Sequence, residues 1–167
     1  MKIGILSDTH GDIGRSVRAL DRLLERACKA ILHCGDIGSM EVLDELAERC
    51  RIHAVPLHAV LGNVDEYDPE LRDYTARDGV RIWGMRADLE FDGRRIAILH
   101  GHHAHALEAA IASGQFNYVL TGHTHVSEDR FEGTTRVINP GAVHRANPPS
   151  VAVLDLSTGE VDFIQTR

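Results

Sequence analysis

The chain has 167 residues, which suits one domain with a single core and leaves little room for a second. Its 25 acidic residues outnumber the 18 basic ones and give a formal charge of −7, which argues against a broad basic face that holds nucleic acid. At 43% hydrophobic and 26% charged residues, the composition excludes a disordered or fibrous protein. We therefore expect a single domain over residues 1–167, with carboxylates and 11 histidines available as metal ligands.

Apolar runs in the sequence are far shorter than the roughly 18 residues of a membrane span. The first run starts at Ile3 and is interrupted by Asp8, which is too early for a secretory signal. The cysteines, Cys28, Cys34 and Cys50, form no Cys-x-x-Cys pair and predict neither a disulfide framework nor a thiolate zinc site. We expect a cytoplasmic protein with no membrane partner.

The first third of the chain alternates short apolar runs with segments of helical periodicity. Strands are expected at residues 3–6, 30–32 and 57–61, and helices at residues 12–30 and 40–50, the second behind a Ser39 N-cap. This alternation predicts parallel strands joined by right-handed crossovers.

The rest of the chain is rich in strands. Strands are expected at residues 80–83, 85–91, 94–99, 118–120, 126–131, 135–138, 151–156 and 161–164, and one short helix at residues 104–112. Asp92-Gly93 is a hairpin signal between two of these strands. The C-terminal strands are expected to form an antiparallel meander.

Polar side chains that can bind metals follow five of the predicted strands at their carboxyl ends. The motifs are Asp8-x-His10, Gly35-Asp36, Gly62-Asn63, His100-Gly101-His102 and Gly122-His123-Thr124-His125. Ligands bind at the carboxyl ends of strands in open α/β sheets, so these loops are expected to converge. Each motif alone is weak, but five in this order indicate one site.

The ordered set resembles the calcineurin-like metallophosphoesterase superfamily, and the likeness covers nearly the whole chain. The size of the chain, the segment Gly62-Asn63-Val64-Asp65 and the turn Asn139-Pro140-Gly141 look most like its compact single-domain bacterial and archaeal phosphodiesterases. The resemblance implies an α/β fold, a four-layer αββα sandwich of two mixed sheets, with a site for two divalent metal ions at one end.

The resemblance also assigns the ligands. One metal ion would be held by Asp8, His10, Asp36 and His125, and the second by Asp36 as a bridge with Asn63, His100 and His123. Two such cations can lower the pKa of a shared water, and the resulting hydroxide would attack phosphorus without a covalent intermediate. We expect manganese, with iron, zinc or nickel as alternatives that suit a mixed oxygen and nitrogen site.

The predicted activity is hydrolysis of a small phosphate ester, most plausibly a diester. Asn63 and His102 are the candidate substrate-binding residues, and no side chain is assigned as catalytic. Many family members carry a histidine where this chain has Val64, and that histidine binds phosphate or protonates the leaving group. Since valine can do neither, we expect slow hydrolysis of poor leaving groups unless His102 or solvent supplies the proton. The role of Asp65, which usually orients the absent histidine, stays open.

Several alternatives accompany this interpretation. A non-catalytic scaffold for protein assembly on the same fold is the leading rival, because fold does not fix function. His33 is expected to be buried and hydrogen-bonded, and Cys34 to be a packing residue rather than a ligand. Substrate selection is expected in residues 66–78 and 104–113. A homo-oligomer is possible, with an exposed Trp83 strand as the contact.

Overall fold

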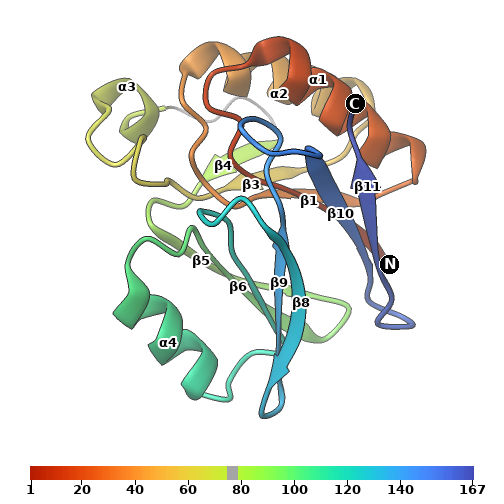
Figure 1. The fold of residues 1–167 in the computed structure, drawn as a ribbon. Coiled ribbons are helices and arrows are strands. Elements are labelled where there is room, and N and C mark those ends of the chain that lie inside the picture. Colours follow the sequence, from red (N-terminus) through yellow and green to blue (C-terminus); the bar gives the residue numbers. More distant parts are fainter. Residues whose placement is uncertain (75–78) are drawn as a thin grey trace.

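Two β-sheets lie face to face in the computed structural model, which describes residues 1–74 and 79–167 (Figure 1). The six-stranded sheet has the order β11-β10-β1-β2-β3-β4 and the five-stranded sheet the order β5-β6-β7-β9-β8. The strands of the first sheet are β1 (Lys2–Leu6), β2 (Ala30–His33), β3 (Leu57–Ala59), β4 (Val80–Ile82), β10 (Ser150–Asp155) and β11 (Val161–Gln165). Those of the second are β5 (Arg86–Phe91), β6 (Arg94–Leu99), β7 (Tyr118–Leu120), β8 (Ser127–Glu132) and β9 (Thr135–Pro140).

Helices cover the outer face of each sheet. The helices are α1 (Ile13–Glu25), α2 (Met40–Ile52), α3 (Pro69–Arg72) and α4 (Ala104–Ala112). In Figure 1, α1 and α2 lie over the six-stranded sheet and α4 lies over the five-stranded sheet. Both sheets contain parallel and antiparallel pairs, as β1 is parallel to β2 and antiparallel to β10.

Three hydrophobic clusters fill the spaces between these layers. Leu20 and Leu43 of α1 and α2 share one cluster with Ile31 of β2. Ile5 of β1 and Ile98 of β6 belong to a second cluster, between the two sheets. A third, smaller cluster joins α4 to the outer face of the five-stranded sheet. The predicted four-layer αββα sandwich is thereby confirmed.

Both long helices begin behind a capping side chain, and the cap at Ser39 is the one that the sequence predicts. The Asp12 carboxylate accepts the backbone N–H of Arg15 at 2.9 Å, and the Ser39 hydroxyl accepts that of Val42 at 3.4 Å. Helix α1 ends at Glu25, five residues before the predicted boundary at residue 30. The backbone turns there, since Ala27 has φ of 59°, in the left-handed region that a helix cannot continue through.

The strand predicted at residues 80–83 is present as β4 and joins the first sheet, parallel to β3. One expectation about the strands needs correction. The C-terminal strands do not form a continuous meander, because β10 leaves β9 and pairs antiparallel with β1. Five of the six residues of β10 are buried, which suits an interior strand of the first sheet.

Helix α3 was not predicted, although its start carries a clear signal. Asp68 caps it by accepting the N–H groups of Glu70 and Leu71, and Pro69 occupies the first helical turn. The helix lies within residues 66–78, where substrate selection was expected, and residues 75–78 of that segment lie outside the described residues. The other segment, 104–113, is almost entirely α4.

Three further expectations can be compared with the structure. No helix in the described part of the chain is both long and apolar enough to cross a membrane. All three cysteines are buried and free, and Cys34 packs between the two sheets as predicted. Trp83 follows the edge strand β4 but is only half-exposed, because its indole N–H donates to His58 at 3.1 Å and Arg81 stacks on its ring. An oligomer through this strand stays a prediction.

Candidate metal centre

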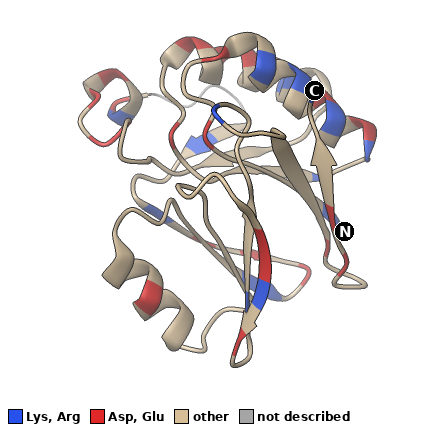
Figure 2. Ribbon diagram, viewed as in Figure 1, with Lys and Arg blue, Asp and Glu red and all other residues tan. Residues whose placement is uncertain are grey.

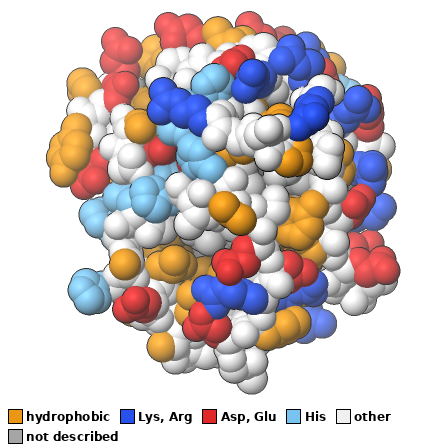
Figure 3. Space-filling view, viewed as in Figure 1, with side chains coloured by type: hydrophobic (Ala, Val, Ile, Leu, Met, Phe, Trp, Pro, Cys, Tyr) orange, Lys and Arg blue, Asp and Glu red, His pale blue; other side chains and the backbone are white. Residues whose placement is uncertain are grey.

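The loops that follow β1, β2 and β6 meet at one end of the sandwich, as the sequence predicts. Asp8, Asp36 and His100 each offer one ligand atom, and these three atoms lie within 4.8 Å of one another. A second group, formed by Asp8, His10 and His125, has the same property. The two groups share Asp8, so they form one continuous cluster. In the space-filling view, histidines gather on this face of the molecule (Figure 3).

The distances within the cluster are those of side chains that converge on a small volume. His125 Nε2 lies 3.1 Å from Asp8 Oδ1 and 3.3 Å from His10 Nε2. His100 Nε2 lies 3.3 Å from Asp36 Oδ1, and His10 Nε2 lies 3.8 Å from Asp36 Oδ2. Five of the seven predicted ligands are therefore brought together.

The remaining two predicted ligands lie at the rim. The ring of His123 is exposed and its centroid lies 5.2 Å from that of His100. Asn63 is exposed in the loop after β3, and within the described residues its amide makes no hydrogen bond to the other six. His123 is thus adjacent to the cluster, whereas Asn63 lies outside it.

An uncommon backbone conformation marks these loops. Positive φ angles at non-glycine residues are rare because Cβ crowds the backbone. The described residues contain nine of them, and the five at predicted ligands are Asp8, His10, Asp36, His123 and His125. Such strain clusters at functional sites, where the surrounding structure has to hold it.

The loops after β2 and β3 also approach too closely for a side chain at Gly62. A Cβ atom built there would lie 2.1 Å from Asp36 Oδ1 and 2.4 Å from the Asp36 backbone nitrogen. Any other residue would displace Asp36. Position 62 therefore requires glycine for a steric reason that does not depend on a bound metal ion.

The cluster has the properties of a cation site. Asp8 is fully buried, and neither its Oδ1 atom nor His100 Nε2 has a hydrogen-bond partner among the described residues. Two buried carboxylates, one of them with an unpartnered oxygen, are costly unless a positive charge compensates them. The donor set of carboxylate oxygens and imidazole nitrogens suits divalent ions. The residues present therefore fit the metal ions that the resemblance implies.

Hydrogen bonds away from the cluster fix the ring of His100. Its Nδ1–H donates to the Cys34 carbonyl oxygen at 2.8 Å, so Nε2 keeps its lone pair toward Asp36. Metal-binding histidines are usually oriented by such a bond to a backbone carbonyl.

His33 is buried and hydrogen-bonded, as predicted, and is not a ligand. Its Nδ1 atom accepts the N–H of Gly35 at 3.2 Å, and its Nε2–H donates to the Thr9 hydroxyl at 3.0 Å. Burial lowers the pKa of His33 to about 3, so the ring stays neutral.

The ionisation of the cluster also favours cation binding. Burial disfavours the charged form of Asp36, but the adjacent His100 ring and the N–H of Val64 outweigh it and lower the pKa of Asp36 to about 2. Burial lowers the pKa of His10, although the charges of Asp36 and Asp8 oppose the shift. Asp36 is therefore ready to bind a cation in its charged form and His10 in its neutral form, whereas the charges of Asp36 and Asp8 raise the pKa of the buried His100 until a cation replaces its proton.

Two residues that support these loops were not assigned roles from the sequence. Asp65 is fully buried and accepts the N–H groups of Gly62, Ile37 and Gly38, each at 2.9 Å. Burial raises the pKa of Asp65, and the three N–H groups oppose that shift. Asp65 therefore ties the loop after β2 to the loop after β3, although it has no histidine to orient.

Asn139 has a similar role for the loop after β7. Its amide group donates to the Gly122 carbonyl at 2.7 Å and to the Thr124 hydroxyl at 3.1 Å. Its Oδ1 atom accepts the N–H of Gly141. The Asn139-Pro140-Gly141 turn therefore lies beside the loop that carries His123 and His125.

His144 was expected to be an ordinary histidine, and the structure places it against the cluster. Its ring centroid lies 6.2 Å from that of His10, and its Nδ1 atom lies 3.2 Å from Asp12 Oδ2. The sequence offers no motif that would have identified it.

The predicted substrate residue His102 lies beside the cluster. Its ring centroid is 5.4 Å from that of His100, and its Nε2 atom is 3.4 Å from a carboxylate oxygen of Glu66. Neither ring nitrogen of His102 has a hydrogen bond to the described residues. Glu66, which precedes α3, also lies 3.7 Å from His103. His102, His103 and Glu66 thus border the cluster on the side of His100.

The sequence of the whole chain supports these features. Residues 1–159 match the family described as the calcineurin-like phosphoesterase superfamily domain. This chain belongs to that superfamily. Phosphodiesterase MJ0936 of Methanocaldococcus jannaschii is 31% identical to this chain over 163 residues, which cover 96% of each protein. Phosphodiesterase YfcE of Escherichia coli K12 is 28% identical over 168 residues, 93% of this chain and 88% of that protein.

Solved structures agree with this assignment. A structure described as a novel archaeal phosphodiesterase has a TM-score of 0.79 and 28% identity, and the two chains cover 99% of each other. Vps29 from Entamoeba histolytica, in complex with zinc, has a TM-score of 0.64 and 18% identity over 100% of both chains. At that identity Vps29 shares the fold alone. The resemblance drawn from the motifs is confirmed.

Proposed function

We propose that this chain is a metal-dependent phosphodiesterase. The observation that carries the proposal is the cluster at the end of the sandwich, where the buried and unpartnered Asp8 Oδ1 faces His125 at 3.1 Å. The related proteins named phosphodiesterases, MJ0936 and YfcE, support the same activity. Family membership implies divalent metal ions, and the cluster provides residues that fit them.

The proposed ligands divide into two sets that share Asp36. One set is Asp8, His10, Asp36 and His125, and the other is Asp36, Asn63, His100 and His123. When bound, two divalent cations would lower the pKa of a water molecule and neutralise charge on a phosphate ester. We propose manganese as the ion, with iron, zinc or nickel as alternatives.

The protein supplies orientation around the cations. The Cys34 carbonyl keeps the His100 ring in one tautomer, and Asp65 holds the loop that carries Asn63 against the loop that carries Asp36. Asn63 and His102 are the proposed contacts to the phosphate. Glu66 lies 3.4 Å from Nε2 of His102 and would orient this ring toward the phosphate.

Val64 decides which substrates should react well. Its side chain is 45% exposed at the rim and carries no group that can donate a proton. Diesters whose leaving group departs without protonation, such as aryl phosphates, should therefore react faster than alkyl diesters. We propose a small phosphate ester as the substrate. The charge of −7, with acidic and basic residues interspersed along the chain (Figure 2), disfavours nucleic acid as a ligand.

The test is activity of the protein after removal of metals with a chelator and reloading with Mn²⁺. The substrates are aryl phosphate mono- and diesters, and the variants are Asp36→Asn and His123→Asn. Each should lower kcat/KM for the diester by at least about 100-fold, because it removes a ligand of the reactive centre. His53→Asn is the matched control, since His53 is exposed beyond the end of α2. Full activity of both ligand variants would refute the assignment.

The same experiment addresses a second function, a non-catalytic scaffold. The fold similarity to Vps29 and the presence of Val64 favour this alternative. A scaffold predicts that the reloaded protein hydrolyses neither ester class. Turnover that depends on Asp36 would exclude it.

A further inference from the structure

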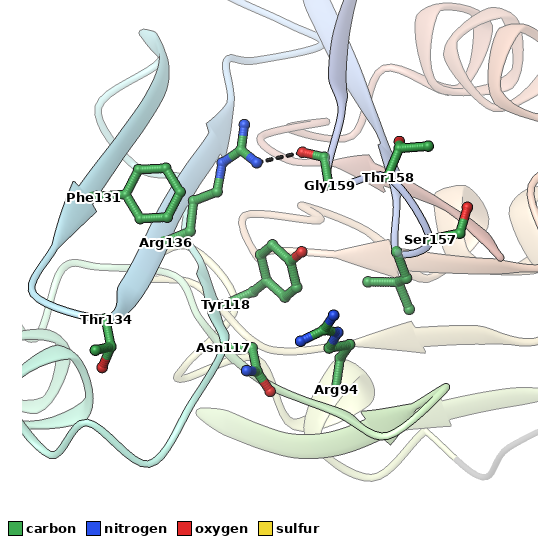
Figure 4. A pocket seen from close by; sticks show the side chains of 10 residues that line it. Arg94, Asn117, Tyr118, Phe131, Thr134, Arg136, Ser157, Thr158 and Gly159 are labelled. Atoms are coloured by element: carbon green, nitrogen blue, oxygen red, sulfur yellow. Dashed lines mark hydrogen bonds between the residues drawn. The ribbon is translucent and has the colours of Figure 1, made fainter.

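A polar cavity lies at the end of the strands opposite to the metal centre. It has a volume of about 340 Å³, and its walls come from the starts of β6, β7 and β9, the end of β8 and the turn between β10 and β11 (Figure 4). Arg94 starts β6 and His100 follows its end. At about 3.3 Å per residue, the cavity lies about 20 Å from the metal centre.

Three side chains of the cavity form one row on the inner face of the five-stranded sheet. Tyr118 pairs with Arg136 on one side and with Ile96 on the other, and Arg94 stands two residues before Ile96 on β6. Ile96 and Ile98 face the space between the sheets, and side chains alternate along a strand, so Arg94 faces that space as well. At this end of the core between the sheets, the side chains are therefore two guanidinium groups and one phenol.

Arg136 forms a fixed wall of the cavity. Its guanidinium donates two hydrogen bonds to the Asp129 carboxylate, each of 2.7 Å, and a third to the Gly159 carbonyl in the turn between β10 and β11. These contacts hold the second sheet against the first. Because Asp129 already balances the charge of Arg136, the free positive charge at the cavity is that of Arg94.

Tyr118, Arg94 and Asn117 bring further hydrogen-bond donors to the cavity. The Tyr118 hydroxyl makes no hydrogen bond in residues 1–74 and 79–167 and opens onto the cavity. In Figure 4 this hydroxyl points toward the turn that carries Gly159, and Arg94 extends beside the same ring. Arg94 makes no ion pair within the described part of the chain. The Asn117 carbonyl accepts the Arg95 N–H at 2.9 Å, which leaves its NH₂ group as a donor.

The mouth of the cavity also offers an aromatic surface. Phe131 lines it with a side chain that is 67% exposed, and the Arg136 guanidinium lies 5.2 Å from its ring centroid. An exposed ring beside a guanidinium is a stacking platform for a flat aromatic group.

We propose that this cavity binds a phosphate monoester that bears a planar base, the chemical class of a nucleoside monophosphate. Arg94, Tyr118 and Asn117 would donate to the phosphate oxygens, and Phe131 would stack on the base. The volume falls within the range of small-molecule sites, about 300–1,000 Å³. The site is separate from the metal centre and its occupation does not depend on the proposed hydrolysis.

The test is a titration of the zinc-loaded protein with adenosine monophosphate, followed by the backbone amide NMR signals of Thr158 and Gly159. Both amides belong to the cavity, and no proposed metal ligand does, so their shifts report this site and not the metal centre. Inorganic phosphate and adenosine are titrated separately. We expect saturable shifts with adenosine monophosphate, weaker ones with phosphate and the weakest with adenosine.

Two variants and a matched control test the contacts. Arg94→Gln should weaken binding about ten-fold or more, and Tyr118→Phe, which removes one hydroxyl, about five-fold. Arg95→Gln is the control, because Arg95 stands on the other face of β6, 5.1 Å from the Phe116 ring. Asp36→Asn should leave the shifts at Thr158 and Gly159 unchanged. Absence of saturable shifts in the unmodified protein, or equal weakening by Arg94→Gln and Arg95→Gln, would overturn the proposal. So would adenosine binding as tightly as the monophosphate.

Discussion

Replacement of Asp65 by alanine should destabilise the protein strongly even without metal. The carboxylate is fully buried and accepts three backbone N–H groups at 2.9 Å. Each bond to a charged acceptor contributes about 1.5–3 kcal/mol, and the burial of the carboxylate itself costs several kcal/mol. The net loss in the free energy of unfolding is therefore about 4 kcal/mol. For a chain of this size that corresponds to a fall in Tm of about 12 °C.

The assay is urea unfolding in the presence of a chelator, which separates the stability of the loops from the contribution of bound ions. Asp68→Ala is the matched control, because Asp68 also accepts two backbone N–H groups but is partly exposed as the cap of α3. It should cost about 1 kcal/mol. If the two variants differ by less than about 1 kcal/mol, the reasoning about the buried carboxylate is wrong.

Three further predictions concern the site and the core. Val64→His places an imidazole at the exposed rim and should raise turnover of alkyl diesters by up to about 100-fold relative to aryl diesters; an unchanged ratio would contradict the role given to this position. Gly62→Ala should abolish binding of metal ions as measured by calorimetry, because its Cβ would lie 2.1 Å from Asp36 Oδ1; Gly133→Ala, with nothing within 4 Å, is its control. The low pKa of His33, about 3 in the folded state against 6.5, means that between these pH values only the unfolded chain gains the proton. Acidification should therefore destabilise the protein by up to about 1.4 kcal/mol per pH unit through this residue, and His33→Gln should unfold with a shallower pH dependence.

The sequence predicts the layers well because local patterns specify them. Apolar runs followed by a polar ligand determine β1, β2 and β6, and the cap at Ser39 marks where α2 begins. Strand partners are a different matter. The sequence of residues 150–155 does not indicate that β10 pairs with β1, which lies about 150 residues away in the chain. Such pairing depends on contacts between distant segments.

The candidate site shows the same division between local and distant information. Asp8, Asp36 and His100 are visible as strand-end motifs, and the structure brings them together. The supporting role of Asp65 is not visible, because its three partners lie in two loops and are backbone groups that carry no sequence signal. Likewise Arg94 and Tyr118 are unremarkable in sequence and become a site only through the pairing of β6, β7 and β9.

The left-handed backbone at the ligand positions has an evolutionary consequence. Asparagine tolerates this conformation better than other residues with a side chain, and it differs from aspartate and from histidine by one nucleotide. A single point mutation at Asp36 or His123 can thus remove a proposed ligand while the loop keeps its shape. Inheritance of the sandwich is therefore separable from inheritance of its chemistry, and lineages with this fold can lose or regain hydrolysis in single genetic steps.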